Sequence, residues 1–115
     1  MTIEAIVQAS SMRSLLKDKR GMIDEFCRRW KVAELALFGS ALRDDFAPNS
    51  DVDFLVTFAP DAEWSLFDHV QMEQELKVLL KRDVDLVSRR AIERSKNWIR
   101  RSNILKAAQV IYAAR

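Results

Sequence analysis

The sequence is poor in residues that cross-link or interrupt a chain. Cys27 is its only cysteine, so no internal disulfide can form, which fits a reducing compartment, and one cysteine with one histidine does not make a zinc site. Phe26 and Trp30 share an expected helix with Cys27, which favours a place in the packed core for the thiol. Glycine and proline occur twice each, so each marks a position where the backbone turns or stops.

Long apolar runs are missing as well. Runs such as Phe54 to Val56 are far shorter than the roughly 20 residues that cross a bilayer as a helix. The first residues, Met1 to Glu4, lack the basic segment and the long apolar stretch of a secretion signal. We therefore expect a cytoplasmic protein with no membrane partner.

A strong excess of charge of one sign is also absent. The net charge of +2 is too small to indicate nucleic-acid binding by itself. Basic residues nevertheless crowd the last quarter of the chain, where Glu93 alone opposes them. This segment could be a solvated helix face, a surface for an acidic partner, or a region that steers the phosphates of a nucleotide; direct nucleic-acid binding is the least favoured. Its basic residues are Arg89, Arg90, Arg94, Lys96, Arg100, Arg101 and Lys106.

The remaining composition is that of one globular domain, taken here as residues 1–115. Apolar residues make up 49% of the chain and charged residues 31%, which excludes a disordered chain. Helical and strand-like patterns alternate, so the class is α/β. The expected helices are 3–9, 15–30, 65–80 and 99–112, with Ser65 or Asp61 as a cap of the third, and the expected strands are 33–38, 52–58 and 84–87.

Two aspartates stand at the mouth of the second expected strand. Asp51 and Asp53 are two residues apart, so in a strand their side chains point to the same face. Close, unpaired carboxylates repel each other unless a cation lies between them. Mg²⁺ typically takes one or two carboxylates together with phosphate oxygens and water. The pair therefore indicates a magnesium site.

A third aspartate lies inside the third expected strand. Asp85 is flanked by Val84 and Leu86, where an unpaired buried carboxylate would be costly. If the third strand lies beside the second, Asp85 joins the other two carboxylates. Three carboxylates on adjacent strands could hold two metal ions that clamp the attacking and leaving oxygens of an in-line phosphoryl displacement.

A Gly-Ser pair follows the first expected strand. Gly39 lets the backbone approach a phosphate closely, and Ser40 adds a hydroxyl where a helical turn is expected to begin. Arg43, one turn further on, could direct its guanidinium at the same phosphates. Each of these features is common as a plain turn or surface residue, but their combination with the aspartates is far more specific.

These motifs resemble a known family. Gly39-Ser40, ten intervening residues and Asp51-x-Asp53 are similar to the signature of DNA polymerase β-like nucleotidyltransferases. Within that superfamily the chain resembles the minimal nucleotidyltransferases of bacteria and archaea over essentially its whole length. The resemblance implies a small mixed β-sheet flanked by helices.

The same resemblance implies the roles of the site residues. Asp51, Asp53 and Asp85 would be the catalytic, metal-binding carboxylates for one or two Mg²⁺ ions, and Gly39 with Ser40 would hold the triphosphate of ATP, the nucleotide donor. Arg43 and Ser50 are predicted to contact the nucleotide as well. Many relatives carry glycine after the arginine, whereas this chain has Asp44 and Asp45, which puts the role of Arg43 in question.

The acceptor is not encoded in these motifs. Some minimal nucleotidyltransferases are antitoxins that attach AMP to a tyrosine of a partner HEPN-domain ribonuclease toxin, and the resemblance makes this protein adenylyltransferase role our first expectation. One alternative is a binding partner that neutralises by complex formation without catalysis. Another is a stand-alone enzyme for small molecules.

Four residues outside the motifs also carry expectations. Asp83 is expected to be a solvated residue at the start of its strand rather than an extra metal ligand, and His69 is expected on the surface. Trp64 and Trp98 could each be a core residue or an interface anchor.

Overall fold

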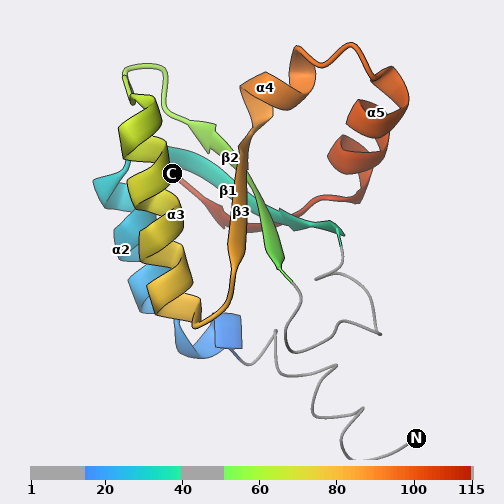
Figure 1. Ribbon diagram of the computed structural model, residues 1–115. Helices are drawn as coiled ribbons and strands as arrows, with labels where there is room; N and C mark the ends of the chain where they lie inside the picture. Colours follow the sequence, from blue (N-terminus) through green and yellow to red (C-terminus); the bar gives the residue numbers. More distant parts are fainter. Residues whose placement is uncertain (1–14, 40–50, 115) are drawn as a thin grey trace, which may run out of the picture.

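A mixed four-stranded β-sheet forms the centre of the described part of the chain. The computed structural model describes residues 15–39 and 51–114 (Figure 1). The strand order is β3-β2-β1-β4, with β1 antiparallel to both neighbours and β2 parallel to β3, which confirms the mixed sheet. The strands are β1 (Val32–Phe38), β2 (Val52–Phe58), β3 (Val84–Ser88) and β4 (Gln109–Ala113).

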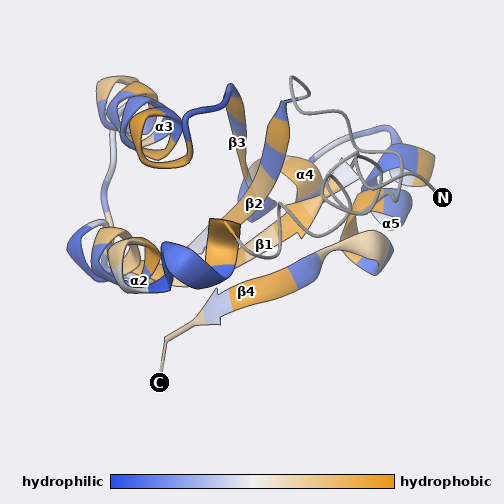
Figure 2. Ribbon diagram, turned by 90° about the horizontal axis from the view of Figure 1, so that it is seen from below, coloured by the Kyte–Doolittle hydropathy of each residue, from blue (hydrophilic) through white to orange (hydrophobic). Residues whose placement is uncertain are grey.

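Helices cover both faces of this sheet. Helices α2 (Arg20–Arg29) and α3 (Leu66–Leu80) lie on one face, while α4 (Arg89–Glu93) and α5 (Trp98–Ala107) lie on the other (Figure 2). The larger core fills the space between the sheet and the first helix pair. A smaller core of Ala36, Phe38, Leu55, Ile92 and Ile104 joins the sheet to the second pair. The α/β class is confirmed.

The larger core follows from strand alternation and helix periodicity. On β2, Phe54 and Val56 are buried on the side of α2 and α3, and Leu76 of α3 is fully buried against them. Cys27 belongs to the same core, as expected. Burial, and then the nearby carboxylate of Asp24, raises the pKa of the Cys27 thiol to about 12, so the thiol stays protonated at neutral pH.

The two inner tryptophans close one end of the larger core. Trp30 and Trp64 meet edge to face with their ring centroids 5.0 Å apart, and the Trp64 indole N–H donates to the Trp30 carbonyl at 2.9 Å. The Trp30 indole N–H donates to the Glu75 carboxylate at 2.6 Å. Trp64 is therefore a core-edge residue, whereas Trp98 is 65% exposed.

The local signals for α3 are confirmed. Ser65 forms a capping box: its hydroxyl accepts from the Asp68 N–H, and the Asp68 carboxylate accepts from the Ser65 N–H. The helix ends at Leu80, and Lys81 adopts the left-handed conformation that often follows a helix. Strand β2 has the predicted bounds. The helix expected over 15–30 is interrupted at Lys19, so α2 begins one residue later.

The expected closing helix over residues 99–112 is wrong in its second half. Helix α5 ends at Ala107, and residues 109–113 form β4 on the free edge of β1. Val110 pairs with Ala36 and Tyr112 pairs with Leu35, so the backbone groups that a helix would satisfy internally bond to β1 instead. The β-branched and aromatic side chains of this run suit a strand.

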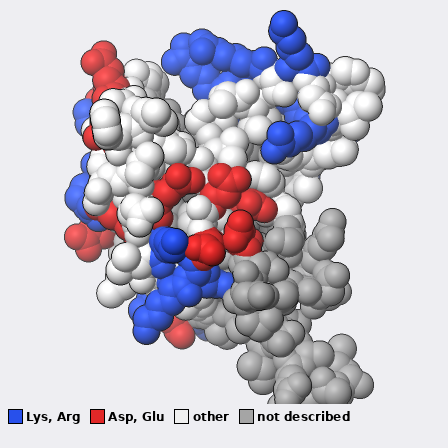
Figure 3. Space-filling view, viewed as in Figure 1, with Lys and Arg blue, Asp and Glu red and all other residues white. Residues whose placement is uncertain are grey.

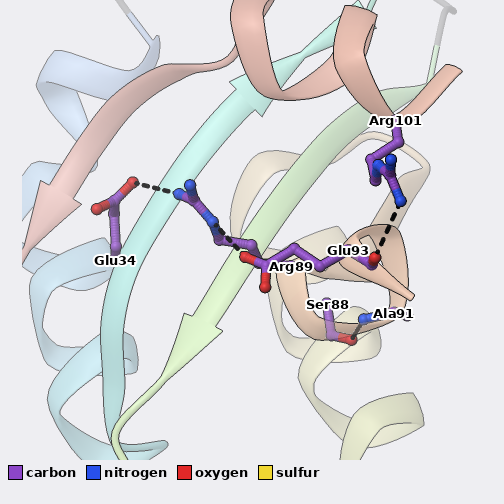
Figure 4. Close-up of polar contacts among 6 residues, drawn as sticks. All are labelled: Glu34, Ser88, Arg89, Ala91, Glu93 and Arg101. Carbon is purple, nitrogen blue, oxygen red and sulfur yellow. Dashed lines mark hydrogen bonds and ion pairs between the residues drawn. The ribbon is translucent and has the colours of Figure 1, made fainter. Parts of the chain in front are cut away.

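Helix α4 was not predicted, and it has its own local signals. The Ser88 hydroxyl accepts from the Ala91 N–H at 3.1 Å and caps the helix start (Figure 4). Arg89 pairs with Glu93 at 3.0 Å, and its guanidinium lies 3.8 Å from the Glu34 carboxylate of β1. These contacts fasten α4 to the sheet.

The outer edge of β3 is closed by side chains of α3. The Leu86 N–H donates to the Glu73 carboxylate at 2.8 Å, and the Leu86 carbonyl lies 2.6 Å from His69 Nε2. The expectation of a surface role for His69 is therefore wrong, because this half-buried ring satisfies a backbone carbonyl. At Leu86 the edge strand therefore presents no uncovered backbone group that could pair with another strand.

Some expectations fall outside the described residues, namely the short helix over 3–9 and the helical turn over 40–43. Across 15–39 and 51–114, no helix combines the length and the apolar character needed to cross a membrane.

Candidate active site

The predicted carboxylates lie on the sheet face opposite α2 and α3. Phe54 and Leu86 point into the larger core, and because strand side chains alternate, Asp53 and Asp85 point to the other face. Asp51, two residues before Asp53, shares this face. Asp53 and Asp85 therefore lie on one face of the sheet, as the sequence predicts if β3 lies beside β2.

The strand register brings two of these aspartates together. Asp53 and Asp85 are direct partners in the parallel pairing of β2 with β3, and adjacent strands lie about 4.8 Å apart. The start of this pairing is fixed by the Val52 N–H, which donates to the Asp83 carbonyl at 2.9 Å. The condition set by the sequence, that the third strand lies beside the second, is met.

The electrostatics of Asp53 reflect this crowding. Burial first, and then the carboxylates of Asp85 and Asp51, raise the pKa of Asp53 above its ordinary value. Asp53 is half-buried, whereas Asp51 and Asp85 are exposed. Acidic side chains gather in the middle of the face shown in Figure 3. The site therefore favours a bound cation at neutral pH.

Gly39 stands directly against Asp53. It has a φ of +74°, a conformation that glycine adopts without strain. A Cβ placed on Gly39 would collide with Oδ2 of Asp53 and would lie 3.4 Å from its Cγ. The preceding residue, Phe38, pairs with Asp53 across β1 and β2. The absence of a side chain at Gly39 thus leaves room for the Asp53 carboxylate.

The donor set fits a hard divalent cation, but the side chains do not form a closed cage. In the described part of the chain, no three acidic, histidine or cysteine side chains converge closely enough to count as a preformed metal cluster. Asp51 and Asp85 are exposed, so their carboxylates are accessible to a cation from solvent. Mg²⁺ is normally held by one or two carboxylates, with water and substrate phosphates completing its shell.

Asp83 is paired away from this group. Its carboxylate lies 2.9 Å from Lys77 Nζ of α3, and both side chains are more than half exposed. The hydrogen bond that Lys77 donates to the Asp83 carboxylate, followed by the charge of that carboxylate, raises the pKa of Lys77. The exposure of Asp83 agrees with the expectation of a solvated residue. Its pairing with Lys77 also distinguishes Asp83 from Asp85.

The remaining predicted nucleotide contacts, Ser40, Arg43 and Ser50, lie outside the described residues. The sequence analysis also missed that α4 and α5 lie on the carboxylate face. Ser88, a cap residue four positions before the buried Ile92, is a signal for the start of α4 but not for the face on which it lies.

Comparison with known proteins gives a family match over most of the chain. A family model described as a nucleotidyltransferase domain matches residues 19–111. The chain is also similar to the protein adenylyltransferase MntA of Thermococcus cleftensis, with 36% identity over 69 residues that cover 60% of this chain and 68% of that protein.

Solved structures share the fold. A structure described as a minimal nucleotidyltransferase superposes with a TM-score of 0.65 at 29% identity, over 84% of this chain and 92% of that one. A Shewanella oneidensis complex of a tri-AMPylated HEPN toxin with an MNT antitoxin superposes with a TM-score of 0.57 at 21% identity, over 85% and 72% of the two chains.

Proposed function

Because the chain belongs to the nucleotidyltransferase domain family, we propose that it transfers AMP from ATP to a hydroxyl of a partner protein, at a metal site formed by Asp51, Asp53 and Asp85. The observation that carries the proposal is the direct pairing of Asp53 with Asp85 on parallel strands, on the same face as Asp51. The partner is a HEPN-domain toxin and the acceptor a tyrosine. The names of the similar proteins, an adenylyltransferase and an AMPylated toxin complex, support this choice.

The carboxylates have separate tasks in this mechanism. Asp53, half-buried and backed by Gly39, would be the fixed ligand of a bound cation, and the exposed Asp51 and Asp85 would be its further ligands. Bound Mg²⁺ supplies charge neutralisation for the triphosphate and for the leaving pyrophosphate. Gly39 and Ser40 hold the triphosphate, with Arg43 and Ser50 as further contacts.

The transfer is an in-line displacement. A carboxylate, for which we choose Asp85, accepts the proton of the acceptor hydroxyl, and that oxygen forms a bond to the α-phosphorus of ATP. The bond from the α-phosphorus to the bridging oxygen breaks, and pyrophosphate leaves. Positioning and charge neutralisation account for most of the rate enhancement in such reactions.

The test is intact-mass spectrometry of a co-purified HEPN-domain partner after incubation with Mg²⁺ and ATP. We expect the partner to gain one or more adenylate units with the wild-type protein and none with Asp51→Ala/Asp53→Ala. Asp61→Ala is the matched control, because Asp61 lies beyond the far end of β2 and pairs with Lys31. A partner that stays bound and unmodified would favour neutralisation by complex formation instead.

A further inference from the structure

A second charged surface lies on the segment that runs through α4 and α5. Basic side chains gather over these helices at the top of the molecule, apart from the acidic group below them (Figure 3). Five of them are exposed, and within the described residues none of the five forms an ion pair. We call this surface the α4–α5 arm; its five exposed cations are Arg90, Arg94, Lys96, Arg100 and Lys106.

Two other arginines of the segment hold the arm together and are not available to a partner. Arg89 pairs with Glu34 and Glu93, and Arg101 donates to the Glu93 carbonyl at 3.4 Å (Figure 4). Arg101 also donates to the Ser95 carbonyl at 3.2 Å. The contacts of these two arginines therefore stabilise the arm, and a separate set of cations on it remains exposed.

Apolar side chains are exposed among these cations. Trp98 is 65% exposed and Ile99 is 57% exposed, at the first two positions of α5. A tryptophan and an aliphatic residue surrounded by arginines have the composition of a protein interface, where aromatic and arginine anchors supply most of the binding energy.

The base of the arm packs beside the carboxylates. Leu55 follows Asp53 by two residues on β2, so the two side chains share a face and their Cα atoms lie about 7 Å apart along the strand. Leu55 contacts the arm through the small core that contains Ile92 and Ile104. A protein bound to the arm would therefore lie on the same face of the sheet as the proposed transfer site.

We propose that the α4–α5 arm docks the acceptor protein through an acidic surface of that partner, and so brings its hydroxyl to the carboxylates. This inference rests on the proposed function. A protein fits better than RNA, because the exposed aliphatic side chain of Ile99 suits the apolar centre of a protein interface and offers nothing that a phosphate chain needs. Opposite charges on the two partners also accelerate their encounter.

The experiment compares two triple charge reversals in the full chain. Arg94→Glu/Lys96→Glu/Arg100→Glu alters the arm, and Lys17→Glu/Arg20→Glu/Arg28→Glu makes the same charge change at exposed positions in and just before α2. The probe is the HEPN-domain protein of the same genome. Initial rates of adenylate incorporation give kcat and the separate KM values for that protein and for ATP.

We expect the arm variant to raise the KM for the protein acceptor about tenfold or more, while kcat and the KM for ATP stay within about twofold of wild type. Trp98→Ala should raise the same KM about tenfold, because a central aromatic anchor is lost. The control should match wild type. Added salt should weaken the wild-type reaction and affect the arm variant less.

Other results would overturn the inference. An unchanged KM in the arm variant, or an equal rise in the control, removes the arm as a docking site. A raised KM for ATP assigns the arm to the nucleotide. Loss of binding to a labelled single-stranded RNA in the arm variant, with the protein KM unchanged, assigns it to nucleic acid.

Failure of the proposed function is recognised separately. If the wild-type protein transfers no AMP to the HEPN-domain protein, the proposed function fails. Docking is then tested by calorimetry, which measures the affinity of each variant for the HEPN-domain protein. Weaker binding by the arm variant then supports the arm, whereas equal binding, or no complex with the wild-type protein, overturns it.

Discussion

The two faces of the sheet carry opposite kinds of side chain at neighbouring positions of the same strands. Phe54 is fully buried on the face of α2 and α3, whereas Asp53, one residue earlier, is half-buried on the other face beside Asp85. Strand alternation alone therefore separates a dry core from a charged site. A slip of one residue would exchange the two faces, so the core fixes the register that the site needs.

The largest expected effect concerns activity on the charged face. Asp85→Ala should lower the rate of AMP transfer on the order of 10⁴-fold, because a proposed metal ligand and proton acceptor is lost, while the melting temperature changes little. Asp83→Ala, which removes a carboxylate paired with Lys77, should leave the rate within about threefold of wild type. Equal losses in the two variants would contradict the assignment of Asp85.

Substitutions on the face covered by α2 and α3 should change the stability of the protein rather than its activity. Phe54→Ala should reduce the free energy of unfolding by about 3–5 kcal/mol, since it empties a fully buried position in the larger core. Val110→Ala, at a half-exposed position on β4, should cost less than about 0.5 kcal/mol. Urea denaturation measures both. A loss below about 1 kcal/mol for Phe54→Ala would show that this face is not the main core.

A substitution at Gly39 should affect both the stability of the protein and its affinity for Mg²⁺. Gly39→Ala should cost about 1–2 kcal/mol, because alanine is strained at a φ of +74°, and it should also displace the Asp53 carboxylate and lower Mg²⁺ affinity. Calorimetry with Mg²⁺ and thermal unfolding report the two losses. Gly21→Ala is the control: a Cβ there meets nothing within 4 Å, and it should stabilise α2 by up to about 1 kcal/mol. A Gly39→Ala protein with unchanged Mg²⁺ affinity would refute the contact with Asp53.

The smallest expected effect is the pH dependence of stability in metal-free protein. Asp53 has a raised pKa in the folded state, so its contribution to stability is fully present below the unfolded value of about 3.9 and is lost as the pH rises through the folded pKa. Asp53→Asn should therefore raise the melting temperature at pH 7, and the gain should shrink toward pH 4. Glu63→Gln, at an exposed position, should show no such trend. A lower melting temperature for Asp53→Asn at pH 7 would contradict the raised pKa.

Local patterns in the sequence predicted part of this arrangement. The bounds of β2, the cap at Ser65 and the common face of Asp51 and Asp53 all follow from neighbouring residues. The adjacency of Asp85 was conditional, because no local signal says which strands pair. The roles of these aspartates in catalysis remain predictions.

The two wrong predictions, a helix through residue 112 and a surface role for His69, share a physical cause. Residues 109–113 follow a helix and continue its apolar pattern, and although Val110, Ile111 and Tyr112 suit a strand, pairing with the distant edge of β1 is what makes them one. His69 has no partner within its own helix, and its contact is a carbonyl 17 residues away. Both depend on tertiary contacts that periodicity does not contain.

The closure of the β3 edge has a consequence for hydrogen exchange. The amide of an uncovered edge strand meets water and exchanges quickly, but the Leu86 N–H donates to Glu73 of α3. Its exchange with deuterium therefore requires the Glu73 side chain to release it, by rotation or by a movement of α3. Since Leu86 follows Asp85, this one amide reports how firmly Glu73 holds the strand that carries the proposed proton acceptor.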